Sequence, residues 1–194
     1  MDKAEAIRLL VCAAAERYEA AGVAVPARLR ELPVDAPASL SPQPAALAAL
    51  PAAIDGMPPG ALRDGLRTCW DGLPWVCVKL AEAEGIDQKF AFAELLGPAA
   101  PGRIGGFRFG FYLQVPGVLY PPHVHAAEEF YCVLSGDCEW RRNDSGFIFR
   151  RPGSVIHHQP WDLHAMRTRA LPMLSMWIWR GDIDYATYRF LKND

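Results

Sequence analysis

All five histidines of this 194-residue chain lie between residues 123 and 164. The densest group is in YPPHVHAAEEFY, where His123 and His125 stand two residues apart and Glu129 follows. Alternate residues of a strand share one face, so the two imidazoles should point the same way. By the same rule, Glu129 and Tyr131 should share a face of the next strand. Two imidazoles and a carboxylate suit one divalent transition metal, Fe(II), Zn(II), Mn(II) or Ni(II), with positions left for a substrate.

The spacing of this segment resembles the first motif of the cupins, a class of small β barrels. Five residues separate Gly117 from His123, and six residues separate Glu129 from Gly136, as in that motif. An HxH pair alone could equally be two surface or hydrogen-bonded histidines. The carboxylate and the two glycines at matching offsets favour metal binding.

The second cupin motif supplies one further histidine after a glycine, and ten residues separate Gly153 from His164. His164 is therefore the next predicted metal ligand. Gln159, Trp161 and Thr168 stand where this motif commonly has Pro, Gly and Asn, and these positions form the turn. His157 and His158 are neighbours on a predicted strand and face opposite ways, so at most one can enter the barrel. We predict structural roles for both.

Aromatic residues form a second set with possible chemistry. Tyr131 shares the Glu129 face, and Tyr120 lies three residues before His123. Buried tyrosines are usually core residues with satisfied hydroxyls. A phenol beside a divalent cation, however, loses its proton more readily and can serve as a base for a weakly acidic C–H. In LSMWIWRG, Trp177 and Trp179 share one strand face and could hold a cationic onium group against their rings.

The composition limits which partners are plausible. The chain is 51% hydrophobic and 22% charged, with a formal net charge of −2, so no broad basic surface for nucleic acid is expected. No apolar run approaches the roughly 18 residues of a membrane span, and the acidic first residues argue against a secretory signal. A soluble, cytoplasmic protein is expected. The five cysteines are scattered without a CxxC pair, which predicts reduced thiols.

The elements that must position these residues divide the chain in two. The residue pattern of the first part predicts an amphipathic helix over 2–21 and an extended proline-rich connection over 24–45. It also predicts helical pieces near 45–54, 60–69 and 74–96. After Pro98 the residues become aromatic and β-branched, with frequent turn signals, which favours a small sandwich or barrel. The predicted division is a helical section at 1–104, a barrel at 105–181 and a tail at 182–194. The predicted strands are 105–115, 118–124, 128–134, 137–142, 146–150, 154–158, 163–169 and 171–180.

Three blocks of the sequence resemble the cupin-type dimethylsulfoniopropionate (DMSP) lyases of marine bacteria. The blocks are YPPHVHAAEEFYCVLSG, RRPGSVIHHQPWDLHAMRT and MWIWRG. The resemblance implies a mainly β cupin barrel preceded by helices. It implies metal ligands at the positions of His125, Glu129, His164 and often Tyr131, with His123 close by or ligating.

The resemblance also implies a carbon–sulfur lyase that cleaves DMSP, a small zwitterion, into dimethyl sulfide and acrylate by β-elimination. Tyr131 is the most plausible base. Tyr120 would orient the substrate or share the base role, and His123, Trp177 and Trp179 would contact the substrate.

Several alternatives remain open at this stage. A related lyase-like cupin or a mononuclear iron dioxygenase could act on another small carboxylate, and some cupins are small-ligand sensors without activity. A dioxygenase needs two open coordination positions on its iron, for substrate and oxygen, so a tyrosine ligand would count against that alternative. The other face of the Glu129 strand, with Phe130, Cys132 and Leu134, could pack on the N-terminal helices or on a second subunit in a homodimer.

Overall fold

The N-terminal part of the chain is helical. The computed structural model describes residues 3–33, 44–77 and 87–191. The helices of this part are α1 (Lys3–Ala20), α2 (Leu50–Asp55) and α3 (Ala61–Cys69), with short 3-10 helices η1 (Ala27–Arg30), η2 (Ala45–Ala49), η3 (Trp70–Gly72) and η5 (Asp87–Lys89). Among the residues described, no helix combines the length and apolar character that a membrane span requires.

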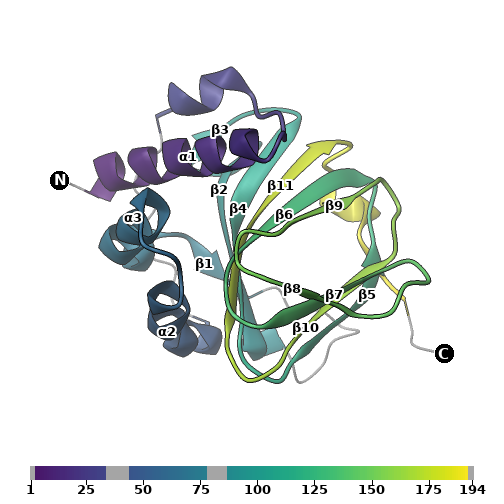
Figure 1. Ribbon diagram of the computed structural model, residues 1–194. Helices are drawn as coiled ribbons and strands as arrows, with labels where there is room; N and C mark the ends of the chain where they lie inside the picture. Colours follow the sequence, from purple (N-terminus) through teal and green to yellow (C-terminus); the bar gives the residue numbers. More distant parts are fainter. Residues whose placement is uncertain (1–2, 34–43, 78–86, 192–194) are drawn as a thin grey trace.

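Two sheets face each other and enclose a barrel, and the helices cover the outside of the larger sheet (Figure 1). The larger sheet has the order β1 (Trp75–Val76), β2 (Phe90–Gly97), β4 (Phe107–Gln114), β11 (Met173–Gly181), β6 (Ala127–Ser135) and β9 (Val155–His158), with β3 (Gly102–Arg103) beside β2. The smaller sheet has the order β12 (Arg189–Phe190), β5 (Leu119–Val124), β10 (His164–Thr168), β7 (Cys138–Arg142) and β8 (Ile148–Arg150). The short 3-10 helix η6 (Tyr185–Thr187) precedes β12.

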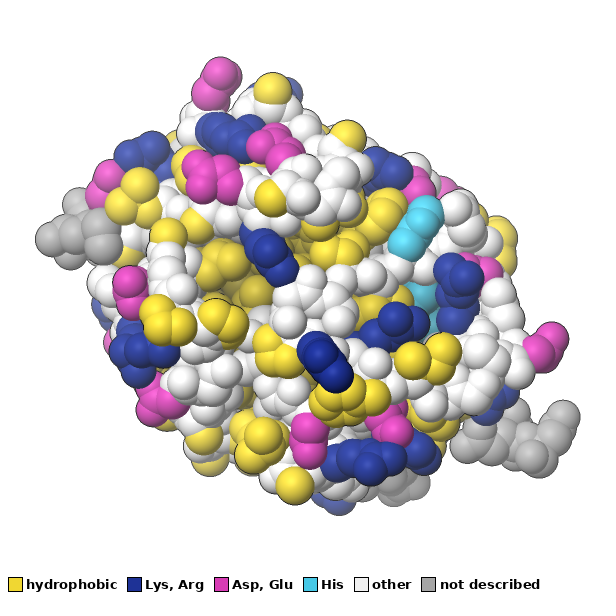
Figure 2. Space-filling view, viewed as in Figure 1, with side chains coloured by type: hydrophobic (Ala, Val, Ile, Leu, Met, Phe, Trp, Pro, Cys, Tyr) yellow, Lys and Arg dark blue, Asp and Glu magenta, His cyan; other side chains and the backbone are white. Residues whose placement is uncertain are grey.

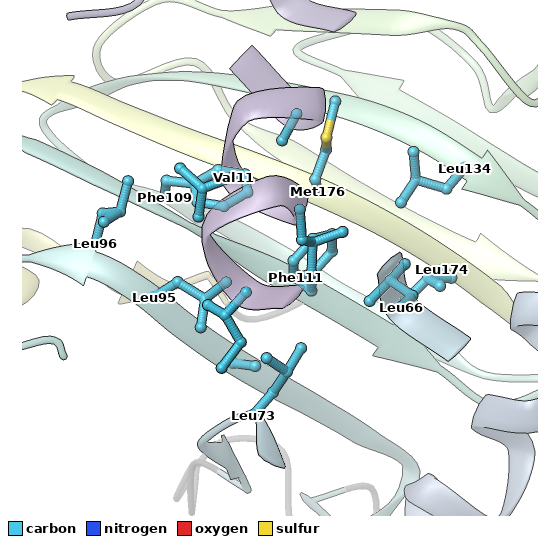
Figure 3. Close-up of a cluster of buried hydrophobic side chains, with 14 of the residues drawn as sticks. Val11, Leu66, Leu73, Leu95, Leu96, Phe109, Phe111, Leu134, Leu174 and Met176 are labelled. Carbon is cyan, nitrogen blue, oxygen red and sulfur yellow. The ribbon is translucent and has the colours of Figure 1, made fainter. Parts of the chain in front are cut away.

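The two faces of the larger sheet have different surroundings because side chains alternate along each strand. One face packs on the helices in an apolar core, where Val11 of α1 lies over Phe109, Phe111 and Met176 (Figure 3). Phe130, Cys132 and Leu134 belong to this core, so that face of β6 packs on the N-terminal helices. The other face lines the barrel interior.

Tyr18 links α1 directly to two neighbouring strands of the larger sheet. Its buried hydroxyl lies 3.1 Å from the carbonyl oxygen of Phe130 in β6 and 3.0 Å from that of Met176 in β11. A hydroxyl proton shared between two carbonyls satisfies a polar group that would otherwise be costly to bury. The helix is thereby fixed to the strands whose inner faces hold Glu129 and Trp177.

The predicted mainly β fold with preceding helices is confirmed. All eight predicted strands appear, as β4 to β11, and the predicted helices over 2–21, 45–54 and 60–69 are present. The connection predicted over 24–45 contains η1, and its residues 34–43 lie outside the described part.

The helix predicted over 74–96 is wrong in its described part. β1 and β2 occupy residues 75–76 and 90–97 there, while residues 78–86 lie outside the described part. FAFAELLG contains good helix formers, but its antiparallel pairing with β4 buries it, and such tertiary burial overrides local propensity. A strand of the sheet thus precedes residue 105, and β12 lies within the predicted tail. The division at residues 104 and 181 stays a prediction.

Gly136 is a glycine that the fold requires. It lies at φ +100° in the turn between β6 and β7, and an added Cβ would clash with the Pro172 carbonyl and stand 2.8 Å from Met173 Cα. We expect Gly136→Ala to lower the free energy of unfolding by about 1–3 kcal/mol, measured by urea denaturation. Gly146→Ala is the control, because a Cβ there meets nothing within 4 Å. Equal stability of the two variants would contradict this account of the turn.

Candidate metal centre

The predicted ligands meet inside the barrel although they come from both sheets. His123 in β5 is the cross-strand partner of His164 at the start of β10. Glu129 in β6 faces Trp179 of β11 on one side and His158 of β9 on the other. His123, His125, Glu129 and His164 are each no more than 2% exposed.

Backbone carbonyls fix the orientation of the three predicted imidazole ligands. Nδ1 of His123 lies 2.8 Å from the Pro121 oxygen, and Nδ1 of His164 lies 2.8 Å from the Asp162 oxygen. Nδ1 of His125 lies 3.1 Å from the Ala127 oxygen. A carbonyl can only accept, so each Nδ1 must carry the proton and donate it. Each Nε2 is then left with a free lone pair, the state in which imidazole binds a metal.

These lone pairs converge on one carboxylate oxygen. Nε2 of His125 and Nε2 of His164 each lie 3.1 Å from Glu129 Oε2. The ligand atoms of His123, His125 and His164 all lie within 4.8 Å of one another. Glu129 Oε1 accepts a hydrogen bond of 2.7 Å from Trp179 Nε1, which orients the carboxylate and leaves Oε2 toward the histidines.

This arrangement of acceptors calls for a cation. Neutral Nε2 atoms and an ionised carboxylate oxygen would repel one another at such distances, and His164 Nε2 is buried without a hydrogen-bond partner among the described residues. A divalent ion shared between them would satisfy every lone pair. The residues therefore form a buried His/Glu metal-binding site, and their mixed nitrogen and oxygen donors fit a borderline transition metal.

The surroundings of Glu129 and His123 keep both side chains in the protonation states that bind a metal. Burial by itself would raise the pKa of Glu129, but the imidazoles packed around it, that of His125 foremost, hold that pKa well below its usual value. Burial, assisted by His164, lowers the pKa of His123 well below the ordinary value. The glutamate is thus ionised and His123 is neutral near pH 7.

His158 is a fourth imidazole at the site, beyond the predicted ligand set. Its Nδ1 lies 3.3 Å from Glu129 Oε2, and its ring stacks on His164 with centroids 3.8 Å apart. Its Nε2 is buried without a hydrogen-bond partner in the described part of the chain. His157 faces outward, where Nε2 contacts Glu128 at 2.8 Å and the ring stacks on Phe130.

The opposite orientations of His157 and His158 were thus correctly predicted. The signal that would select His158 is the pairing of β9 with β6, which sets His158 beside Glu129. The predicted structural role of each histidine stays a prediction.

His158 should make the metal-free protein sensitive to acid. Burial, with a contribution from His164, lowers the pKa of His158 to about 4, whereas an unfolded histidine titrates near 6.5. The unfolded chain therefore takes up a proton between these values that the folded protein does not. Stability present above about pH 6.5 should be lost as the pH falls to about 4, by about 3 kcal/mol from this group.

This pH dependence can be measured by urea denaturation of chelator-treated protein across that range. His158→Asn should lose less stability between pH 6.5 and 4 than the unmodified chain. The control is His157→Asn, on the outer face of the same strand. This variant should keep the dependence of unfolding free energy on pH that His158 contributes. Parallel curves for the unmodified and His158→Asn proteins would contradict the assignment.

The predicted catalytic tyrosines are both buried near the candidate ligands. The ring of Tyr131 lies 6.1 Å from that of His158 and 5.0 Å from that of Trp140, and the ring of Tyr120 lies 5.0 Å from that of His123. Burial raises the pKa of Tyr131 well above its ordinary value, and the negative charge of Glu129 raises it further. Burial likewise raises the pKa of Tyr120. Without a bound cation, both tyrosines are neutral phenols.

Tyr188 also belongs to the site, although it was not among the predicted site residues. Its ring stacks on His123 with centroids 5.0 Å apart and an interplanar angle of 16°, and its hydroxyl donates to the Tyr120 hydroxyl over 2.9 Å. The segment is held there by β12, in which Phe190 pairs with His123. No motif marks Tyr188, and only its place among the aromatic residues of DYATYRF hinted at a buried role.

The two tryptophans lie on the inner face, but they contact different groups. Trp179 donates to Glu129, and its ring lies 4.4 Å from that of His125. Trp177 donates to the carbonyl oxygen of Phe111 over 3.3 Å, with its ring 6.0 Å from that of Trp179. The predicted aromatic row therefore lies on the inner face of the barrel, and its Trp179 end orients a candidate metal ligand.

Comparison with known proteins identifies relatives of this chain. A family model described as dimethylsulfoniopropionate lyase matches residues 27–175. The chain is 30% identical over 130 residues to the dimethylsulfoniopropionate lyase DddQ of Ruegeria pomeroyi, an alignment that covers 65% of this chain. The chain spans less than two thirds of the curated relatives that it matches, 64% of one and 41% of another.

Solved structures agree with the sequence matches. A chain from the crystal structures of the DMSP lyases RdDddP and RnDddQII superposes with a TM-score of 0.80 at 25% identity, covering 98% of this chain and 100% of its own. The cupin-2 domain Rru_A2000 of Rhodospirillum rubrum shares the fold, with a TM-score of 0.53 at 14% identity over 64% of this chain and 78% of its own. The predicted cupin fold is thus confirmed. Since the family model spans most of a chain whose barrel encloses a His/Glu centre, this protein belongs to the dimethylsulfoniopropionate lyase family.

Proposed function

We propose that this protein is a metal-dependent carbon–sulfur lyase that cleaves DMSP into dimethyl sulfide and acrylate. The observation that supports this most strongly is the convergence of His125, His164 and Glu129 beside two buried tyrosines. The family assignment favours DMSP as the substrate, since DMSP lyase is the activity named for the relatives. We expect His125, Glu129 and His164 to hold the ion, with His123 and Tyr131 as further ligands.

A divalent cation held there would act as a Lewis acid on the substrate carboxylate and acidify the adjacent C–H. Tyr131 is the proposed base and takes that proton at its phenolate oxygen. The electron pair of the broken C–H bond forms the C=C bond, and the C–S bond breaks with its pair leaving on sulfur. Dimethyl sulfide departs as a neutral molecule, so no acid is needed at sulfur, and acrylate keeps the carboxylate.

The remaining residues of the cavity would position the substrate. The Tyr120 hydroxyl is held by Tyr188, so it can orient the substrate carboxylate or share the base role. Trp177 and Trp179 offer ring faces to the sulfonium group, an attraction of roughly 1–2 kcal/mol once water is excluded. His123 would contact the substrate if it does not ligate.

The direct test supplies DMSP to protein loaded separately with Fe(II), Zn(II), Mn(II) or Ni(II) and measures dimethyl sulfide in the headspace. Gas above the level of a protein-free blank, with acrylate formed in equal amount, is the expected result. No gas with any of the metals would reject DMSP as the substrate. Oxygen consumption with a small carboxylate and Fe(II), without gas, would instead indicate a dioxygenase.

A further inference from the structure

A second cavity lies where the two sheets meet at their free edges. β9 ends the larger sheet and β8 ends the smaller one. Between them lies a cavity of about 460 Å³, which we call the seam cavity. On this side of the molecule, where Figure 1 places β9, histidine side chains lie beside Lys or Arg side chains at the surface (Figure 2). The lining of the seam cavity includes Trp140, Ile148, Arg150, Val155 and Ile156.

Strand pairing directs part of this lining toward the barrel interior. Trp140 pairs with Ile148 across β7 and β8, and Cys138 pairs with Arg150, so all four side chains share one face of the smaller sheet. Cys138 and Trp140 belong to the buried inner cluster, which identifies that face as the inner one. The inner edge of β8 therefore presents an arginine to the cavity.

Two buried N–H groups of this lining lack an acceptor. Trp140 is 2% exposed, and its indole Nε1 has no hydrogen-bond partner among the described residues. The same holds for Nε of Arg150. Indole and guanidinium nitrogens can only donate, and leaving such donors unpaired in a protein interior is unfavourable. Together they call for an occupant with acceptor oxygens.

The charge of the lining favours an anion. The lining contains three arginines, Arg141, Arg142 and Arg150, and one carboxylate, that of Asp144. Arg142 is already engaged, since its Nη1 donates to the His157 carbonyl oxygen over 3.0 Å. In the described part of the chain, Arg150 forms no ion pair, so its charge remains available to a ligand.

We propose that the seam cavity binds a small monocarboxylate, with its oxygens held by Arg150 and the Trp140 indole N–H. Ile148 and Ile156 provide apolar contact for a short hydrocarbon tail. Trp140 lines the seam cavity, and its ring lies 5.0 Å from the ring of Tyr131, the proposed base. The identity of the natural ligand rests on the proposed function, whose substrate carries a carboxylate and whose product, acrylate, is a monocarboxylate.

Propionate binding to the metal-free protein tests this site without any turnover. We expect the Trp140 indole N–H resonance, assigned by its loss in Trp140→Phe, to shift saturably as sodium propionate is added at constant ionic strength. Propionamide, which has the same shape without the charge, should produce no such shift. Because no metal or DMSP is present, the result does not depend on lyase activity.

Two arginine variants locate the binding group. Arg150→Met should weaken propionate binding at least about 10-fold, as expected for loss of a charge-assisted hydrogen bond. Arg151→Met changes the exposed neighbouring arginine and should bind as the unmodified chain does. The proposal is overturned if the Trp140 resonance does not respond to propionate, if propionamide shifts it equally, or if Arg150→Met binds unchanged. The comparison of propionate with propionamide uses the unmodified protein, so it holds even if a variant fails to fold.

Discussion

Glu129→Gln should weaken divalent-metal binding by at least about 100-fold and abolish dimethyl sulfide production. The Oε2 atom of Glu129 lies 3.1 Å from both His125 Nε2 and His164 Nε2. An amide in its place removes the negative charge that balances the cation. Since loss of a group that merely orients a ligand costs 10- to 100-fold in metal affinity, loss of a ligand should cost more. Competition with a chromophoric chelator measures the affinity.

Glu128→Gln is the matched control, because the two carboxylates are sequence neighbours on opposite faces of β6. Glu128 pairs outside the barrel with Arg180 and His157. Its replacement should leave metal affinity and gas production close to those of the unmodified chain. Full metal binding by Glu129→Gln would show that the ion is held elsewhere.

Tyr131→Phe should reduce turnover by roughly 10²- to 10⁴-fold, the usual contribution of a positioned base. The protein should remain folded and, at saturating metal concentration, stay loaded with one ligand fewer, since three imidazoles and the carboxylate remain to hold the ion. Burial and Glu129 raise the pKa of this phenol, so a cation must favour the phenolate before the tyrosine can accept a proton. Initial rates of dimethyl sulfide release at saturating DMSP measure the effect, and metal content is determined on the same samples.

Two other tyrosines distinguish a base from a packing residue. Tyr112→Phe removes a buried hydroxyl that donates to Gln114 and should keep most activity, although its ring lies 6.3 Å from that of Tyr131. Tyr120→Phe tests the shared base role. If Tyr120→Phe loses turnover while Tyr131→Phe keeps it, the two assignments must be exchanged.

The strands and the main ligands could be predicted because their signals are local. Turn residues separate the strands, and alternation fixes which side chains share a face, so His123, His125 and Glu129 could be grouped from spacing alone. β2 could not be predicted, since its Ala- and Leu-rich sequence also suits a helix. Its conformation depends on the distant strand β4, with which it pairs.

The residues that were missed reach the site through long-range pairing. His158 enters because β9 pairs with β6, and Tyr188 enters because β12 pairs with β5. The hydrogen bond from Trp179 to Glu129 likewise depends on the register between β11 and β6. A single sequence does not reveal which strands pair or in which register. His164, which comes from a distant hairpin, could be predicted because the second cupin motif places a histidine at that position.

The shared core between the helices and the larger sheet has a practical consequence for dissecting the molecule. A fragment cut at residues 105 and 181 would lose β2, β12 and the whole helical cover, leaving Phe109, Phe111 and Met176 in contact with water. Exposed apolar surface of that size promotes aggregation. Shortened versions intended as miniature metal scaffolds should therefore retain the N-terminal helices or replace the uncovered aromatic face with polar side chains.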